Sequence, residues 1–289
     1  MKLYLDCIPC FQKQALFVTK DLDEKLRSKI LRKVIHYLYN IEWETSPDEL
    51  SQHIYELIKK ETGIDDPYLE IKKQSTQEAK KFYPRLKEKL QGINDDEERF
   101  YTAVLIAIAG NIIDFGPQIK IDLQKTLSEV LEKDPGINDI GLLYKKIHTS
   151  ETLLYFADNA GEIVFDKIFI EEMIAIRKRP FKKISFVIKG IPIINDAMIV
   201  DADESEIDKL PNIVYLKLGN GDSQTGYKRK DKIVEQWIDQ HDLVISKGQG
   251  NFEGLNNYKG IFFLLMAKCS IIANELGVKE MDTVVKLNN

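Results

Sequence analysis

The sequence predicts an α/β protein that has a largely parallel sheet with helices on both faces, preceded by an all-helical N-terminal domain. Apolar residues recur at helical spacing through the first half of the 289-residue chain. From about residue 150, short β-rich apolar runs alternate with helical segments, which is typical of a parallel sheet. We therefore expect a helical domain over 1–133 and an α/β domain over 134–289 that carries the functional site.

Helices are predicted in the first half wherever apolar residues recur every three to four positions between charged faces. Ser46 before Pro47 is a favourable N-cap, with proline in the first turn. The expected helices cover 9–19, 22–39, 47–62, 68–91, 97–113 and 116–132. Acidic and basic residues alternate over 20–33 and 59–87, and we expect both stretches to face solvent.

The second half alternates predicted strands with predicted helices. The strands cover 152–157, 184–188, 213–218, 243–246, 261–266 and 283–287. The helices cover 161–177, 197–202, 227–240 and 267–276. The linking segment near 134–150 has a loop at its start and few turn residues after it, so we expect the two halves to pack tightly together.

Composition and charge restrict the class of protein. The chain is 44% hydrophobic and 30% charged, which is typical of a soluble globular protein. It has no apolar run long enough to cross a membrane and no apolar leader, so we expect a cytoplasmic location. A net charge of −5 argues against bulk binding of nucleic acid or of an anionic membrane.

The scarcity of cysteine and histidine limits the kinds of metal site. Three cysteines indicate a reducing compartment, and four histidines disfavour a histidine-rich zinc site. A catalytic metal would therefore be held mainly by oxygen ligands, which favours Mg²⁺, Mn²⁺ or a similar ion. Cys7 and Cys10 form a C-x-x-C pair, for which we favour reduced thiols packed beside Cys269 over a metal or redox role.

Polar clusters that contain glycine follow three of the predicted strands. The first is 158–162 (DNAGE), where a strand runs into a helix and Glu162 and Asp166 share one helical face. The second is 189–196, which carries Lys189, Asn195 and Asp196. The third is 247–253 (KGQGNFE), whose glycines allow a backbone nest for an anion beside Lys247. Each cluster alone also fits an ordinary turn or helix cap.

Together the three clusters predict a single site. Loops at the carboxyl ends of parallel strands line one crevice, and these loops bring carboxylates, amides and lysines. Such a set of groups is typical of a metal-assisted phosphate site. At the end of the last long helix of the first half, Asn111 and Asp114 are spaced to point into the crevice from the helical side. The polar loop 219–226 is long enough to close over a ligand.

These clusters, in this order, resemble the DUF89 family of metal-dependent damage-control phosphatases. Cys7-x-x-Cys10 and the segment 110–116 (GNIIDFG) resemble its C-x-x-C-bearing, archaeal-type branch. The resemblance spans nearly the whole chain. It implies a helical part packed on a Rossmann-like α/β part, with a divalent ion (Mn²⁺, Mg²⁺, Co²⁺ or Ni²⁺) in the crevice and a small phosphorylated metabolite as substrate.

The resemblance also implies roles for individual residues. Asp158, Asn159 and Asp196 match the family's metal ligands, and Lys247 matches the basic residue that holds the substrate phosphate. With these four as candidate catalytic residues, the candidates for substrate or phosphate contact are Asn111, Glu162, Lys189, Asn195, Gly248, Gln249 and Glu253. Glu162 and Glu253 are candidates for orienting water or sugar hydroxyls. Attack by a metal-bound water and formation of an aspartyl phosphate on Asp158 both fit these residues.

Two other classes of function fit parts of the sequence. An acidic loop with glycine after a first strand also occurs in methyltransferases that bind S-adenosylmethionine, although the G-x-G pattern is missing from 158–162. A non-enzymatic thiol or metal-binding module would depend on Cys7 and Cys10. The phosphatase requires a metal, the methyltransferase does not, and only the module should fail when both cysteines are replaced.

Overall fold

The structure is a computed structural model that describes residues 3–111, 123–219 and 232–289. Its centre is a seven-stranded sheet in the order β1-β7-β6-β5-β2-β3-β4. Neighbouring strands are parallel except β6 and β7, which are antiparallel. The strands are β1 (Ile137–Asn138), β2 (Thr152–Phe156), β3 (Lys183–Lys189), β4 (Ile213–Leu218), β5 (Leu243–Lys247), β6 (Ile261–Met266) and β7 (Thr283–Asn288). The predicted α/β class with a largely parallel sheet is confirmed.

Helices cover both faces of the sheet, because its central strands are apolar on both sides. On β2, Tyr155 packs into the core of one face and Phe156 into the core of the other. The first face carries α4 (Leu69–Gln91), α5 (Asp96–Ala109), α6 (Leu123–Glu132), α7 (Ile140–Thr149), α8 (Ile163–Arg177) and α9 (Ile199–Glu204). The second carries α10 (Lys232–Asp239), α11 (Gln249–Leu255) and α12 (Ser270–Leu276).

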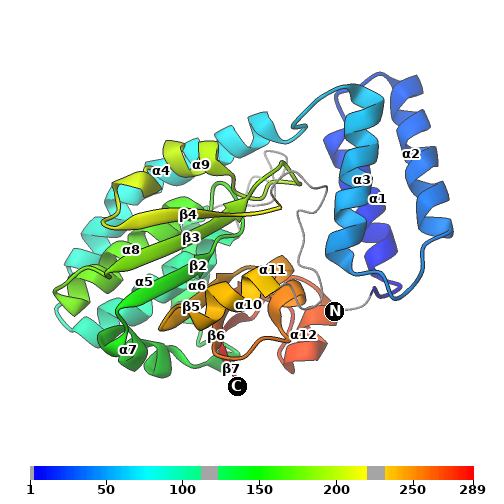
Figure 1. Ribbon diagram of the computed structural model, residues 1–289. Helices are drawn as coiled ribbons and strands as arrows, with labels where there is room; N and C mark the ends of the chain where they lie inside the picture. The colour runs from blue at the N-terminus through cyan, green and yellow to red at the C-terminus, as the bar shows by residue number, and fades with distance from the viewer. Residues whose placement is uncertain (1–2, 112–122, 220–231) are drawn as a thin grey trace.

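The first three helices form a separate bundle beside the sheet (Figure 1). They are α1 (Cys7–Val18), α2 (Glu24–Tyr39) and α3 (Pro47–Thr62). Ser46 caps α3 by accepting a hydrogen bond from the Glu49 amide, as its sequence context predicts. The bundle has its own apolar core, whereas α4 and α5 share the core of the sheet. The apolar cores divide the helices after α3, whereas the predicted boundary at residue 133 falls after α6. That boundary stays a prediction.

Two helices lie where the sequence predicts none. In the segment 134–150, Ile140, Leu143 and Ile147 form the buried face of α7, and the preceding strand β1 has only two residues. The cluster after β5 is helix α11, which begins directly after Gly248. Its seven residues are too few for a clear apolar period. The predictions for Asp114 and for most of the loop 219–226 lie outside the described residues.

The prediction that 59–87 faces solvent is wrong at Lys72, which is 1% exposed. Its ammonium pairs with Asp66 at 2.7 Å and with Asp201 of α9 at 3.4 Å. Burial of a lysine requires such partners, and Asp201 is far away in the sequence.

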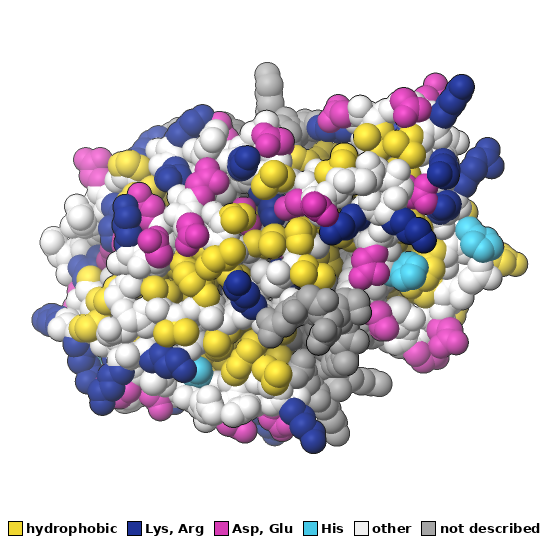
Figure 2. Space-filling view, turned by 45° about the horizontal axis from the view of Figure 1, so that its top comes forward, with side chains coloured by type: hydrophobic (Ala, Val, Ile, Leu, Met, Phe, Trp, Pro, Cys, Tyr) yellow, Lys and Arg dark blue, Asp and Glu magenta, His cyan; other side chains and the backbone are white. Residues whose placement is uncertain are grey.

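Elsewhere the surface is mixed, as Figure 2 shows for one face, where acidic and basic side chains are interspersed around a group of apolar ones. None of the helices in the described part of the chain is long and apolar enough to cross a membrane.

Candidate metal and phosphate site

The site lies where the strand order reverses, between β2 and β5. The chain continues from β2 through β3 to β4 on one side, and β5 pairs with β2 on the other side. Loops at the carboxyl ends of the strands on either side of such a switch point border one crevice. The loop after β2 carries Asp158, and Gly248 follows β5. This position brings the predicted clusters together.

Asp158, Asn159 and Asp196 lie in two hydrogen-bonded segments, one after β2 and one after β3. The Ala197 amide donates to the Asp158 carbonyl at 2.8 Å, and the Ala160 amide donates to the Asn195 carbonyl at 3.0 Å. Asn159 and Asp196 also form an isolated antiparallel bridge. The two loops thus pair through a separate antiparallel contact beyond the parallel strands, which brings the backbones of the three predicted ligands next to one another.

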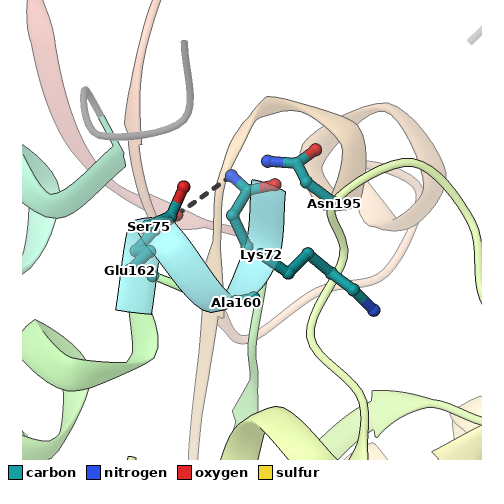
Figure 3. A pocket seen from close by; sticks show the side chains of 7 residues that line it. Lys72, Ser75, Ala160, Glu162 and Asn195 are labelled. Atoms are coloured by element: carbon teal, nitrogen blue, oxygen red, sulfur yellow. Dashed lines mark hydrogen bonds between the residues drawn. The ribbon is translucent and has the colours of Figure 1, made fainter. Parts of the chain in front are cut away.

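Two asparagine amides donate to the same pair of carboxylates. Nδ2 of Asn111 lies 2.8 Å from Oδ2 of Asp158 and 2.6 Å from Oε2 of Glu162. Nδ2 of Asn159 lies 2.8 Å and 3.2 Å from the same two oxygens, and the dashed line in Figure 3 marks its bond to Glu162. Asn111 thus reaches the crevice from the helical side, next to the end of α5.

The side chain of Lys247 is fully buried, and its ammonium has three protein acceptors. Nζ lies 2.9 Å from the Ala107 carbonyl, 2.5 Å from Oε1 of Glu162 and 2.6 Å from Oδ1 of Asp166. Burial lowers the pKa of this lysine, but the charges of Asp166 and Glu162 outweigh that effect and raise it overall. In this arrangement all three ammonium donors are used within the protein, so a phosphate would have to replace one of these acceptors. The phosphate contact of Lys247 stays a prediction.

The other predicted contacts divide into two groups. Lys189 lies at the end of β3, with its ammonium 3.3 Å from Oδ2 of Asp196, and Asn195 lines the pocket described below. Gln249 and Glu253 lie on α11, where the Gln249 amide nitrogen is 3.2 Å from Glu253 Oε1 and 3.4 Å from the Cys269 sulfur. The Gly248 amide donates to the Leu264 carbonyl at 3.1 Å, so it is engaged in the sheet.

A small pocket opens beside Asn159, between the loops and helix α4 (Figure 3). It is lined by Lys72, Ser75, Asn159, Ala160, Gly161, Glu162 and Asn195. Lys72 and Ser75 are not predicted to lie here, since α4 reads as a solvated helix. The one residue in the sequence that could have indicated this contact is Gly161. A Cβ at position 161 would stand 2.9 Å from the Cβ of Ser75, so glycine permits the close approach of α4.

The donor set fits a hard divalent ion. Asp158 and Asp196 offer carboxylate oxygens, and Asn159 offers an amide oxygen, which are the ligand types of Mg²⁺ and Mn²⁺. A further buried oxygen, Oδ1 of Asn111, has no hydrogen-bond partner among the described residues. No group of three or more His, Cys, Asp or Glu side chains with metal-binding spacing occurs within 3–111, 123–219 and 232–289. The predicted set has only two carboxylates, so it is not a group of that kind.

The cysteines are free thiols. Burial raises the pKa of Cys7 and of Cys10, and each interacts electrostatically with Cys269 and Glu253. Packing of the pair beside Cys269 stays a prediction. A raised pKa keeps a thiol protonated at neutral pH, which disfavours a nucleophilic role.

The structure is that of an α/β protein with a candidate site of oxygen ligands at the switch point of its sheet. The family model for the damage-control phosphatase ARMT1-like domain matches residues 3–284, so the chain belongs to this family. Recognition of the DUF89 family from the sequence is thus confirmed.

Similar proteins come from three archaea. A damage-control phosphatase of Pyrococcus horikoshii is 33% identical over 96% of this chain and 95% of its own length. A damage-control phosphatase of Archaeoglobus fulgidus is 33% identical over 82% of this chain and 80% of its own. A Methanocaldococcus jannaschii protein named only as uncharacterized is 28% identical over 99% and 95%. The crystal structure of a DUF89 family protein from P. horikoshii matches all of both chains with a TM-score of 0.85 at 30% identity.

Proposed function

We propose that this protein is a metal-dependent phosphatase that hydrolyses small phosphorylated metabolites, either sugar phosphates or damaged phosphometabolites. The observation that carries the proposal is the meeting of Asp158, Asn159 and Asp196 at the switch point of the sheet. The family to which the chain belongs, and the names of its relatives in P. horikoshii and A. fulgidus, support the same activity.

In this proposal Asp158, Asn159 and Asp196 hold one divalent ion (Mn²⁺, Mg²⁺, Co²⁺ or Ni²⁺). When bound, such an ion supplies Lewis-acid stabilisation of phosphoryl oxygens. The protein holds the three ligands in place for the ion. The hydrogen bonds between the loops after β2 and β3 fix the spacing of the three side chains before any ligand arrives.

Lys189 is the cation best placed for the substrate phosphate. Its ammonium lies 3.3 Å from Asp196, and its strand ends at the crevice. A lysine so near a proposed metal ligand can bind a phosphate oxygen as a point charge. Asn195, at the rim of the pocket, is then placed to contact the rest of the substrate. The roles of Gln249 and Glu253 as substrate contacts remain part of the proposal.

Asp158 has two possible parts in the reaction, and both remain in the proposal. As a ligand alone, it holds the ion while water attacks phosphorus. As a nucleophile, its carboxylate attacks phosphorus while the bond from phosphorus to the substrate's alcohol oxygen breaks and the alcohol leaves. Water then hydrolyses the aspartyl phosphate to inorganic phosphate and the free carboxylate. In either case the amides of Asn111 and Asn159 orient the carboxylate through Oδ2, which accepts both hydrogen bonds.

The test is hydrolysis of p-nitrophenyl phosphate by metal-stripped protein, with Mn²⁺, Mg²⁺, Co²⁺ or Ni²⁺ restored singly. Activity should return with at least one ion and should fall by about 10²–10³-fold or more in Asp158→Ala. The matched control is Asp203→Ala, which removes an exposed aspartate of α9 and should leave the activity unchanged. A screen of sugar phosphates would follow.

The same assay distinguishes the alternative functions. Activity that does not depend on metal, or that survives in Asp158→Ala, would contradict the proposed site. If no ion restores hydrolysis of p-nitrophenyl phosphate or of any sugar phosphate, the next measurement is the binding of S-adenosylmethionine, which a methyltransferase requires.

A further inference from the structure

A continuous chain of hydrogen bonds links the interior of α8 to the proposed metal site. The hydroxyl of Tyr155 donates to Oδ1 of Asp166 at 2.7 Å, and the Lys247 ammonium donates to the same oxygen and to Oε1 of Glu162. The other oxygen of Glu162 accepts from the amides of Asn111 and Asn159. Glu162 therefore uses one oxygen toward the core and the other toward the site.

The bonds to Asn159 fix which way its amide faces. Both neighbours of its Nδ2 are carboxylate oxygens, Oδ2 of Asp158 and Oε2 of Glu162. An ionised carboxylate only accepts hydrogen bonds, so the NH₂ group of the amide must face these two acids. The Oδ1 atom then points away from them, on the side available for a cation.

We propose that Glu162 is a positioning residue that sets the orientation of the Asn159 amide for metal binding, and that Lys247 holds Glu162 for this task. This inference rests on the proposed function, because it requires the ion to bind at Asp158, Asn159 and Asp196. It gives Glu162 and Lys247 roles other than contact with substrate. Asp166 and Tyr155 support Lys247, and neither is a predicted site residue.

The burial of the network supports a positioning role. Glu162, Asp166 and Lys247 are each 1% exposed or less, so they offer almost no surface to a substrate, although Glu162 lines the small pocket. Burying charged groups costs free energy that apolar residues would avoid, so such a network gives little stability in return. The network does, however, hold the Glu162 carboxylate and the amides bonded to it in one arrangement. Partners behind the ligands of a metal site commonly have this effect, and their replacement weakens metal binding about 10–100-fold.

The experiment is a titration of the full-length, metal-stripped protein with Mn²⁺, in which electron paramagnetic resonance measures the free ion. Glu162→Gln keeps the shape of the side chain but brings an NH₂ group that competes with the Asn159 amide. We expect its Kd for Mn²⁺ to rise by about 10–100-fold. The control is Glu172→Gln on the same helix, a buried acid paired with Lys87 at 2.6 Å and far from the site. Its Kd should equal that of the wild type.

A second variant removes the dependence on amide orientation. An aspartate at 159 offers oxygen on both sides, so in the Asn159→Asp background the loss caused by Glu162→Gln should disappear. It should even reverse, because the second substitution relieves repulsion between two carboxylates. A merely structural role of Glu162 would give the same loss in both backgrounds. This reversal is therefore the readout specific to positioning.

The outcomes separate the inference from the proposed function. If wild-type protein binds Mn²⁺ and Glu162→Gln binds it equally well, the inference is overturned and the proposed metal site stands. An equal loss in both backgrounds also overturns it. If the wild type binds none of Mn²⁺, Mg²⁺, Co²⁺ and Ni²⁺, or binds them no better than Asp158→Ala does, the proposed metal site is wrong, and the inference fails with it.

Discussion

Gly248 and Asp158 approach each other so closely that a Cβ at position 248 would stand 1.9 Å from Oδ2 of Asp158. The backbone of Gly248 also has a φ of +77°, in the region that favours glycine. The two residues follow different strands, Gly248 after β5 and Asp158 after β2, and these strands pair side by side. The glycine thus sets how near the chain after β5 comes to the carboxylate.

We expect Gly248→Ala to displace Asp158 and to lower phosphatase activity about 10²-fold or more, since small displacements of a reacting group have effects of that size. Activity with restored metal and the Kd for Mn²⁺ measure the effect. The control is Gly260→Ala, because Gly260 has a φ of +78° but open space around a Cβ. That variant should lose about 1–2 kcal/mol of stability and keep its activity. Equal activity of the two variants would contradict the argument.

Replacing Lys189 tests the proposed phosphate contact. Lys189→Gln removes the cation 3.3 Å from Asp196 without adding bulk. We expect KM to rise about 10–100-fold, as for loss of a hydrogen bond to a charged group of about 1.5–3 kcal/mol. The Kd for Mn²⁺ should stay equal or fall, because a positive neighbour is lost. Lys209→Gln on the surface is the control. A weaker Mn²⁺ affinity with unchanged KM would show that Lys189 serves the ligands instead.

The contact between Gly161 and α4 predicts a stability effect that also reaches the pocket. In Gly161→Ala the new methyl group would stand 2.9 Å from the Cβ of Ser75 and 3.0 Å from its carbonyl carbon. The helix must shift, which we expect to cost about 1–3 kcal/mol in the free energy of unfolding and to change KM. In α7, Gly141→Ala meets nothing within 4 Å and should not destabilise the protein. Urea denaturation and steady-state kinetics measure the two effects.

The cysteine pair separates the phosphatase from a thiol-dependent module. We expect Cys7→Ser/Cys10→Ser to keep its metal-dependent activity, because the pKa of each thiol is raised by burial and neither lies among the proposed ligands. The measurement is kcat/KM for p-nitrophenyl phosphate beside thermal unfolding. A loss of activity with an unchanged melting temperature would point instead to a direct thiol role.

His241 predicts a loss of stability in mild acid. Its Nδ1 contacts the Trp237 carbonyl at 2.6 Å and its Nε2 contacts the Ser185 hydroxyl at 2.8 Å. Burial lowers the pKa of His241 below its usual 6.5, so as the pH falls the unfolded chain takes up a proton before the folded one. Stability is therefore retained above about pH 6.5 and decreases below it.

Replacement of His241 should remove that part of the acid response. We expect the free energy of unfolding of His241→Gln to fall less steeply below about pH 6.5 than that of the wild type, measured by urea titration at several pH values. The control is His36→Gln, since His36 is exposed on α2. Parallel pH profiles of the wild type and His241→Gln would rule out this histidine as a source of the slope.

The class of fold could be predicted from the amino-acid sequence, because local apolar patterns distinguish strands from helices. Apolar period and strand length place the central strands and most helices within a few residues of their observed ends. The clusters after β2, β3 and β5 also predict a shared site, since carboxyl ends of parallel strands meet at one edge. Asp158, Asn159 and Asp196 therefore could be grouped without the structure.

The pairing of the buried charges could be found only from the three-dimensional packing. Lys72 reads as a surface lysine because one of its two partners, Asp201, is 129 positions away, and no local pattern records such a contact. Lys247 matches a phosphate-binding lysine in sequence, and the pairing of its ammonium with Glu162 and Asp166 across two layers of the fold is visible only in the structure. Pairing of charges depends on which faces pack together. That packing is set by the whole core, whereas the strands and helices are set largely by their own residues.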